Sequence, residues 1–137
     1  MATTTRAVLR QRLSEAMGDY TSMTTTSAGA ADGTTLIDTG LRNLSGGRDD
    51  DSFEGWYVLL TSSAASGEIK RVLQSRESVN SITLQEAFSI QVAGSITYEL
   101  HRNDPTLKHN AINRGIEELS NQVPLPLRDE TIVVDNT

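Results

Sequence analysis

The sequence predicts an α+β fold, in which a small antiparallel β sheet or barrel module is flanked by an N-terminal helix and a C-terminal helix, with extended arms. In the middle of the chain, short apolar runs alternate with polar turns at a spacing typical of antiparallel strands. Towards both ends, apolar residues recur at helical spacing. The length of 137 residues suits one domain, residues 1–137.

An N-terminal helix is predicted over residues 3–20. A threonine at position 3, 4 or 5 is suited to cap its start, and Gly18 is expected to end it. The apolar side chains at helical spacing share one face, which consists of Leu9, Leu13, Ala16, Met17 and Tyr20.

Three arginines of this helix lie mostly off the apolar face, namely Arg6, Arg10 and Arg12. Two interpretations stay open for them. They keep an exposed helix soluble, or they dock onto an acidic neighbour, to which the planar guanidinium group binds in bidentate fashion. We take all three as candidate partner-interface residues.

Residues 21–35 are rich in Thr, Ser, Ala and Gly and low in complexity. The composition indicates a flexible linker that buries too little apolar surface to fold alone. The alternative is an arm that becomes ordered only against a partner.

The β module is predicted over residues 36–102. Residues 36–37 form a short strand or turn, and residues 41–55 form a loop. Further strands are expected at 56–61, 68–74, 81–85 and 95–101. The first of these, WYVLLT, is nearly continuously apolar, which predicts burial on both faces. The turn-forming residues 62–67 make it one arm of a hairpin.

A C-terminal helix is predicted over residues 105–120. Asp104 is a strong N-cap, and Pro105 fits the first helical position, where no N–H is needed. Asn121 is expected to cap the other end, and Pro124 and Pro126 prevent continuation. Its apolar stripe comprises Ile112, Ile116 and Leu119, with Leu107 and Ala111 flanking.

The tail, residues 121–137, contains an isolated segment of high β propensity, TIVVD. A solitary terminal strand pairs either with the sheet of its own domain or with another chain. We therefore add Thr131, Ile132, Val133 and Val134 to the candidate partner-interface residues.

The composition and charge of the chain argue against several classes of function. The formal net charge of −6 argues against sequence-independent binding of nucleic acid, which requires cations opposite the phosphates. The chain has no cysteine, so disulfides, thiolate metal sites and thiol catalysis are excluded. No apolar run is long enough to span a bilayer, and the first residues lack a signal-peptide core, so we expect a soluble protein made in the host cytoplasm.

The densest polar cluster is residues 48–54, RDDDSFE, with four carboxylates. Calcium binding through hard oxygen ligands is conceivable there, but the alternating ligand positions of an EF-hand loop are absent. A solvated acidic loop is the favoured interpretation.

No residue pattern predicts catalysis. His101 and His109 are expected to be exposed groups at a strand end and in the second helical turn, because two imidazoles do not complete a zinc site. The sequence contains no GxSxG elbow, no phosphate-binding P-loop and no GxGxxG fingerprint. We therefore predict no catalytic residues, no cofactor, no metal and no enzyme activity.

Several segments together resemble virion structural proteins of tailed bacteriophages, those described as head-to-tail connector, adaptor or neck proteins. The resemblance covers the chain from about Arg6 to Leu119. The segments are TTLIDTGLRNL, SFEGWYVLLTSSAASGEIKRVL, SITLQEAFS and YELHRNDPTLKHNAINRGIEEL. FEGWYV with SGEIKRV, and YELHR with the helix after it, carry most of the resemblance.

The resemblance implies a subunit of a dodecameric ring in the virion neck, beneath the portal, which joins the capsid to the tail. The expected partners are further copies of the chain, the portal protein and a downstream neck or tail protein. Genome DNA would pass through the ring without specific binding, and acidic walls would repel it. The alternative function is an accessory tail or capsid β module that binds a receptor or carbohydrate.

Overall fold

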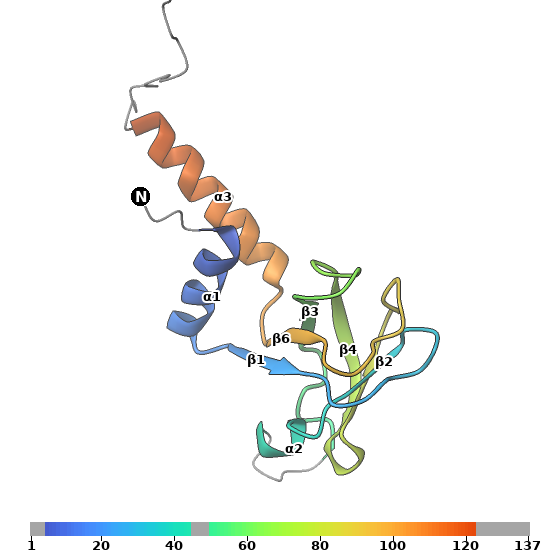
Figure 1. Cartoon of the computed structure of the whole chain (residues 1–137). Helices are drawn as coiled ribbons and strands as arrows, with labels where there is room; N and C mark the ends of the chain where they lie inside the picture. Colours follow the sequence, from blue (N-terminus) through green and yellow to red (C-terminus); the bar gives the residue numbers. More distant parts are fainter. Residues whose placement is uncertain (1–4, 45–49, 123–137) are drawn as a thin grey trace, which may run out of the picture.

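The computed structural model describes residues 5–44 and 50–122, and it has the predicted α+β fold (Figure 1). The helical elements in these residues are α1 (Arg6–Met17), α2 (Leu41–Leu44), the 3-10 helix η1 (Glu77–Val79) and α3 (Pro105–Gln122). The strands are β1 (Tyr20–Thr24), β2 (Thr35–Ile37), β3 (Tyr57–Leu60), β4 (Ile69–Arg76), β5 (Ser81–Leu84) and β6 (Thr97–His101).

The sheet is six-stranded and antiparallel, with the order β1-β6-β3-β4-β5-β2. A bulge between Val72 and Gln74 shifts the register of β4 against β5, and bulges increase the local bend of a strand. The chain just after β1 then reaches β2 at the opposite edge, where Thr26 N donates to Ile37 O at 3.0 Å and Ser27 forms a bridge with Ile37. The sheet therefore curls into a small barrel whose outer strands are tied together at one end.

The core fills the inside of this barrel. Val58 and Leu60 on β3 and Tyr98 and Leu100 on β6 are completely buried. On the other face of β3, Leu59 is also buried, beneath the helices. The prediction of burial on both faces is thus confirmed for residues 58–60, whereas Trp56 and Tyr57 are half-buried and Thr61 is exposed. The predicted hairpin with the next strand is also confirmed.

The prediction of a linker or arm for residues 21–35 is wrong, because the segment begins and ends in strands of the sheet and is hydrogen-bonded to the domain between them. Residues 20–24 pair with β6 along their full length as β1. Farther on, Gly29 N donates to Val92 O at 2.8 Å. A Cβ on Gly33, whose φ is +77°, would lie 2.6 Å from Phe88 O. Backbone pairing makes these small polar residues part of the fold, although their composition carries no hydrophobic signal.

We expected residues 41–55 to form a loop, but this segment begins with the short helix α2. Leu41, the first residue of α2, is completely buried. After it, Phe53 contacts Trp56 edge-on, with ring centroids 5.2 Å apart, and the Arg102 guanidinium lies 5.6 Å from the indole centroid. Trp56 therefore packs against the core rather than standing free on the surface.

Both long helices begin as predicted. Thr5 Oγ1 accepts from Val8 N at 3.4 Å at the start of α1, and Gly18 ends that helix in the left-handed conformation with φ +65°. Asp104 Oδ1 accepts from Thr106 N at 2.8 Å at the start of α3. The prediction that Asn121 caps α3 is wrong, because the helix continues to Gln122.

The two helices lie side by side on the outer face of the barrel, and α3 projects well beyond α1 (Figure 1). The predicted terminal strand, residues 131–134, lies outside the described residues. Among the described residues, no helix has the length and apolar character required to cross a membrane.

Candidate functional site

The contact between the two helices and β6 is polar and buried. On β6, Glu99 and His101 are two residues apart, so both side chains point to the outer face of the barrel. Arg10 and Ser14 come from α1, and Lys108 comes from α3. We call this group the buried polar cluster, and its members are Arg10, Gln11, Ser14, Asp19, Glu99, His101, Lys108 and His109.

Glu99 is the anionic centre of the cluster and is completely buried. Arg10 binds its carboxylate with two hydrogen bonds, from Nε at 3.0 Å and from Nη2 at 2.7 Å. Gln11 Nε2 donates to it at 3.1 Å, and His101 Nε2 lies 2.9 Å from Oε2. Burial by itself raises the pKa of Glu99, but these donors outweigh it and lower the pKa to about 2.

His101 connects Glu99 to a buried lysine. The Lys108 ammonium lies 3.1 Å from Nδ1 of the ring. Because an ammonium group only donates, Nδ1 is the acceptor, and the proton on Nε2 is donated to Glu99. The Tyr20 ring also covers the imidazole, with centroids 5.4 Å apart.

The Lys108 ammonium group also donates hydrogen bonds to two groups near the C-terminal end of α1. Its Nζ donates to Asp19 Oδ1 at 2.7 Å and to Ser14 Oγ at 2.9 Å. Asn103 Nδ2 donates to the other oxygen of Asp19 at 2.7 Å. Burial raises the pKa of Asp19, but the hydrogen bonds from Lys108 and Asn103 and the charge of Lys108 lower it overall.

His109 lies at the edge of the cluster, where Arg10 Nη1 is 3.2 Å from its Nε2. The guanidinium group only donates, so this nitrogen accepts. Burial, followed by the charges of Arg10 and Arg6, lowers the pKa of His109. The ring is half-buried.

The prediction of two exposed histidines is therefore wrong for His101, which is completely buried, and only partly right for His109. The prediction of an exposed Arg10 is wrong as well, because 7% of it is exposed and it binds Glu99. Arg6 and Arg12 are exposed as expected. The remaining candidates, Thr131 to Val134, lie outside the described residues.

The predicted apolar face of α1 is not the face that is buried. Arg10 and Ser14 are the buried residues of this helix, whereas Leu9 and Leu13 are half-buried and Met17 is 51% exposed. The surface of the sheet that faces this helix carries Glu99 and His101, so the helix packs against it with polar rather than apolar side chains. An apolar-periodicity argument does not detect such a face.

The donors and acceptors of the cluster are matched to one another, which makes it a means of fixing α1 and α3 on the barrel. Arg10 on α1 pairs with Glu99 on β6, and Lys108 on α3 pairs with Asp19 in the turn after α1. Breaking such a buried pair is strongly destabilising, because it leaves an uncompensated charge. Across residues 5–44 and 50–122, no group of three or more His, Asp or Glu side chains is placed to hold a metal ion.

The described part of the acidic loop uses its carboxylates locally. Asp50 accepts from Ser78 N at 3.1 Å and from Ser78 Oγ at 2.9 Å. These hydrogen bonds lower the pKa of Asp50. Its neighbours Arg48 and Asp49 lie outside the described residues. The arrangement agrees with a loop that is fastened to η1.

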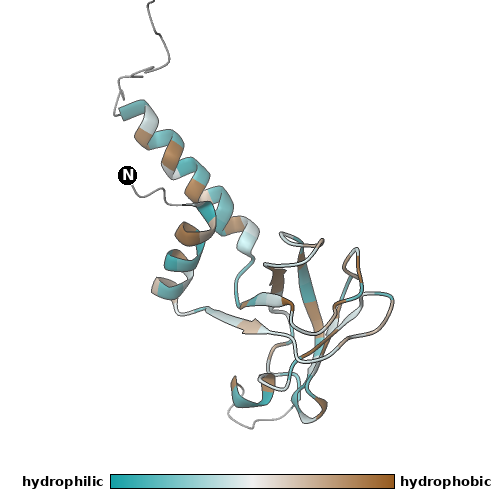
Figure 2. Ribbon diagram, in the orientation of Figure 1, coloured by the Kyte–Doolittle hydropathy of each residue, from teal (hydrophilic) through white to brown (hydrophobic). Residues whose placement is uncertain are grey.

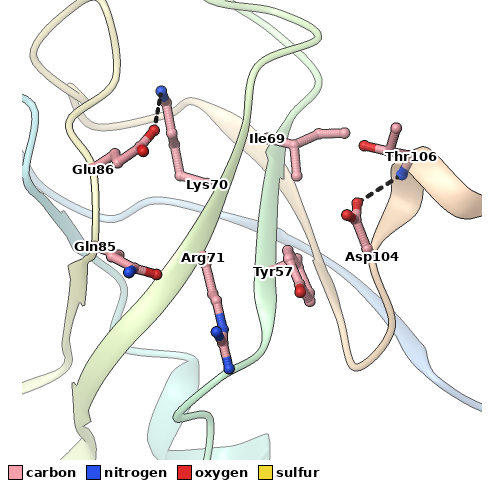
Figure 3. A pocket seen from close by; sticks show the side chains of 8 residues that line it. All are labelled: Tyr57, Ile69, Lys70, Arg71, Gln85, Glu86, Asp104 and Thr106. Carbon is pink, nitrogen blue, oxygen red and sulfur yellow. Dashed lines mark hydrogen bonds and ion pairs between the residues drawn. The ribbon is translucent and has the colours of Figure 1, made fainter.

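Two of the hollows that described residues line adjoin the helices. One, of about 230 Å³, lies on the outer face of β3 and β4 beside the first turn of α3 (Figure 3). Tyr57, Ile69 and Arg71 line it, and Lys70 reaches across to Glu86 with its Nζ 3.5 Å from Oε2. The other, of about 300 Å³, lies beside α1.

Comparison with known proteins gives no relative for this chain. No family model, no curated protein and no solved structure matches it. The functional argument therefore depends on the residues and their arrangement.

Proposed function

We propose that this chain is a structural subunit of the neck of a tailed bacteriophage, an adaptor that forms a ring beneath the portal and joins the capsid to the tail. The resemblance of its segments to neck proteins suggests the class. One observation supports it most directly: the apolar stripe of α3 continues, exposed, beyond the part of the helix that α1 covers.

The two helices differ in length, with 12 residues in α1 and 18 in α3. Arg10 meets His109 and Ser14 meets Lys108, so α1 covers the beginning of α3. Beyond this contact, α3 extends away from the rest of the molecule (Figure 1).

The face of α3 that packs against α1 continues along the free part of the helix. Ile112 is half-buried, Ile116 is 52% exposed and Leu119 is 63% exposed. Their spacing of four and three residues places them on one side, and apolar positions recur along the projecting ribbon (Figure 2). In the proposed ring, a helix of a neighbouring copy covers this stripe.

Because Ile116 and Leu119 are already partly covered, burying the rest of each side chain would contribute about 1–2 kcal/mol, which is small for one interface. A closed ring multiplies such contacts, because each copy is held by two neighbours. Ring closure also requires a fixed angle between the parts of a subunit. The buried polar cluster supplies it by holding α3 on the barrel.

We propose two other kinds of contact, one through exposed arginines and one through the C-terminal tail. Arg6 and Arg12 are exposed cations of a chain with net charge −6, available to acidic partners. The terminal segment 131–134 is proposed to add a strand to the portal or to another neck protein. The negative charge of the ring repels the phosphates of the passing genome. The subunit acts by shape and valency, without turnover.

The test places Lys at position 116 in the phage that encodes the chain. We expect Ile116→Lys to yield heads and tails that fail to join, because the charge prevents burial of the stripe. Leu107→Lys is the matched control. Leu107 is 66% exposed on the same helix and lies about 140° around the axis from Ile112, so joining should be normal.

Electron microscopy of particles labelled with antibody against the chain supplies the location. We expect label at the head-to-tail junction. Label on tail fibres, or equal yields of joined particles for both variants, would contradict the proposed function.

A further inference from the structure

The 300 Å³ hollow beside α1 has the features of a binding cleft. It lies between α1, the beginning of α3 and the turn that joins β3 to β4. Leu59 supplies an apolar surface, while Arg6, Arg10, Gln11, Glu99 and His109 supply polar ones. A volume of this order lies at the lower end of the range of small-ligand pockets.

The side chains that line the cleft carry one more positive charge than negative charge. Glu99 is offset by Arg10, which binds it with two hydrogen bonds, and it accepts further bonds from Gln11 and His101. Arg6, by contrast, makes no hydrogen bond or ion pair with any residue that the structure describes.

His109 adds a second unused donor. Its Nε2 accepts from Arg10, so the proton of the neutral ring is on Nδ1. Within residues 5–44 and 50–122, Nδ1 has no hydrogen-bond partner. Arg6 and His109 come from different helices and line the same cleft.

We infer that this cleft binds a carboxylate carried on an aliphatic chain, with Arg6 and His109 Nδ1 as donors and Leu59 against the aliphatic part. One surplus cation matches a single negative charge. A doubly charged phosphate fits less well, because its second negative charge has no unpaired cation in the cleft to offset it and is repelled by Glu99. The same chemistry is offered by a small carboxylic acid and by an acidic protein segment.

The chain itself contains such a segment, in which Glu117 and Glu118 stand between Ile116 and Leu119 at the free end of α3. Insertion of this segment from one copy into the cleft of the next would be a heterologous contact, the kind that generates rings. The carboxylate inference itself does not depend on the ring, because binding is measured on the isolated chain.

The experiment is a titration of the full chain observed by NMR at the Leu59 methyl groups and the His109 ring. The probes are butyrate, inorganic phosphate and the peptide NRGIEELSNQ, which is residues 113–122. We expect saturable shifts with butyrate or with the peptide. Saturation by butyrate alone identifies a small acid as the ligand, and tighter saturation by the peptide identifies a protein segment.

Two variants with the same change in net charge separate the cleft from general electrostatics. Arg6→Gln should weaken binding about tenfold, the usual effect of losing one charge-assisted hydrogen bond. Arg12→Gln should leave it unchanged, because Arg12 does not line the cleft. Both side chains are exposed, so both variants should fold.

Titration of the His109 ring provides a readout that a merely structural role for Arg6 would not move. The groups around it are Arg10, Arg6, Glu99 and His101. A bound carboxylate adds negative charge and should raise the His109 pKa. The inference is overturned if neither carboxylate probe saturates, if phosphate binds as tightly as butyrate, or if Arg12→Gln weakens binding as much as Arg6→Gln.

Discussion

Protonation of Glu99 should remove a large part of the stability of this protein in acid. The folded-state pKa of Glu99 is lowered to about 2, against an ordinary value of 4.5. A depressed pKa contributes stability that is present above the ordinary pKa and is lost as the pH falls through the folded value. The relevant window therefore extends from about pH 4.5 down to about pH 2.

The difference between the two pKa values corresponds to about 3 kcal/mol in the free energy of unfolding at neutral pH. About 2.5 kcal/mol of this is lost by the time the pH reaches about 2.5. Because a domain of this size is stable by only about 5–15 kcal/mol, the loss is easily measured. Asp19 adds to the fall, since its pKa is lowered too.

The assay is urea unfolding at a series of pH values from about 6 to about 2.5, which covers most of the window of Glu99. The fluorescence of the single tryptophan, Trp56, reports the transition, because it packs against Phe53. Glu99→Gln removes the titrating group, so the difference between wild type and variant isolates the contribution of Glu99. We also expect the variant to be less stable at neutral pH by about 3–5 kcal/mol, because Arg10 loses its buried partner.

Glu86→Gln is the matched control. The Glu86 side chain is 78% exposed and pairs with Lys70 at 3.5 Å, so its removal should cost less than about 1 kcal/mol. If Glu99→Gln is too unstable to measure, Glu99→Gln combined with Arg10→Met removes both charges and gives the same comparison. Equal pH dependence in wild type and in the Glu99 variants would refute the reasoning.

Three further changes test other parts of the fold. Lys108→Met should lower the free energy of unfolding by about 3–5 kcal/mol, whereas the control Lys70→Met should lower it by less than about 1 kcal/mol. Urea titration measures both values, and equal effects would contradict the burial argument. Asp104→Ala should cost about 1 kcal/mol through loss of the α3 cap, and Asp104→Asn should restore most of it in thermal unfolding. Burial, and then the hydrogen bond to Asp38 and its charge, raise the pKa of Tyr98 above the ordinary 10.0. Stability from Tyr98 is therefore present below about pH 10 and is lost above it, so Tyr98→Phe should flatten the alkaline unfolding profile, and ultraviolet absorbance should show Tyr98 ionising together with unfolding rather than before it.

The elements that could be predicted from sequence carry their signals locally. The apolar run of β3, the turn after it and the alternation in β4 lie next to one another in the chain, and they form the observed hairpin. Asp104 and Pro105 likewise mark the start of α3 within two residues. By contrast, β1 has a polar composition, and only its pairing with β6, far away in sequence, makes it a strand.

The buried polar cluster was missed because its partners are distant in sequence. Arg10 and Glu99 are 89 residues apart, and so are Lys108 and Asp19. Polar residues on a helix are usually solvated, so each looked like a surface group when considered by itself. One signal was available: Glu99 and His101 alternate with buried apolar residues in β6, which indicates a second, polar interface on that strand.

The joining of β2 to the chain after β1 affects how the protein behaves when many copies are crowded together. An unpaired strand edge is a template for pairing with other chains, and natural proteins protect such edges against aggregation. Here, Ser27 and Ile37 hold the outer strands of the sheet together at one end and leave less free edge there. Crowded copies therefore offer one another less unpaired backbone at this end of the sheet, which lowers the risk of irreversible strand pairing between them.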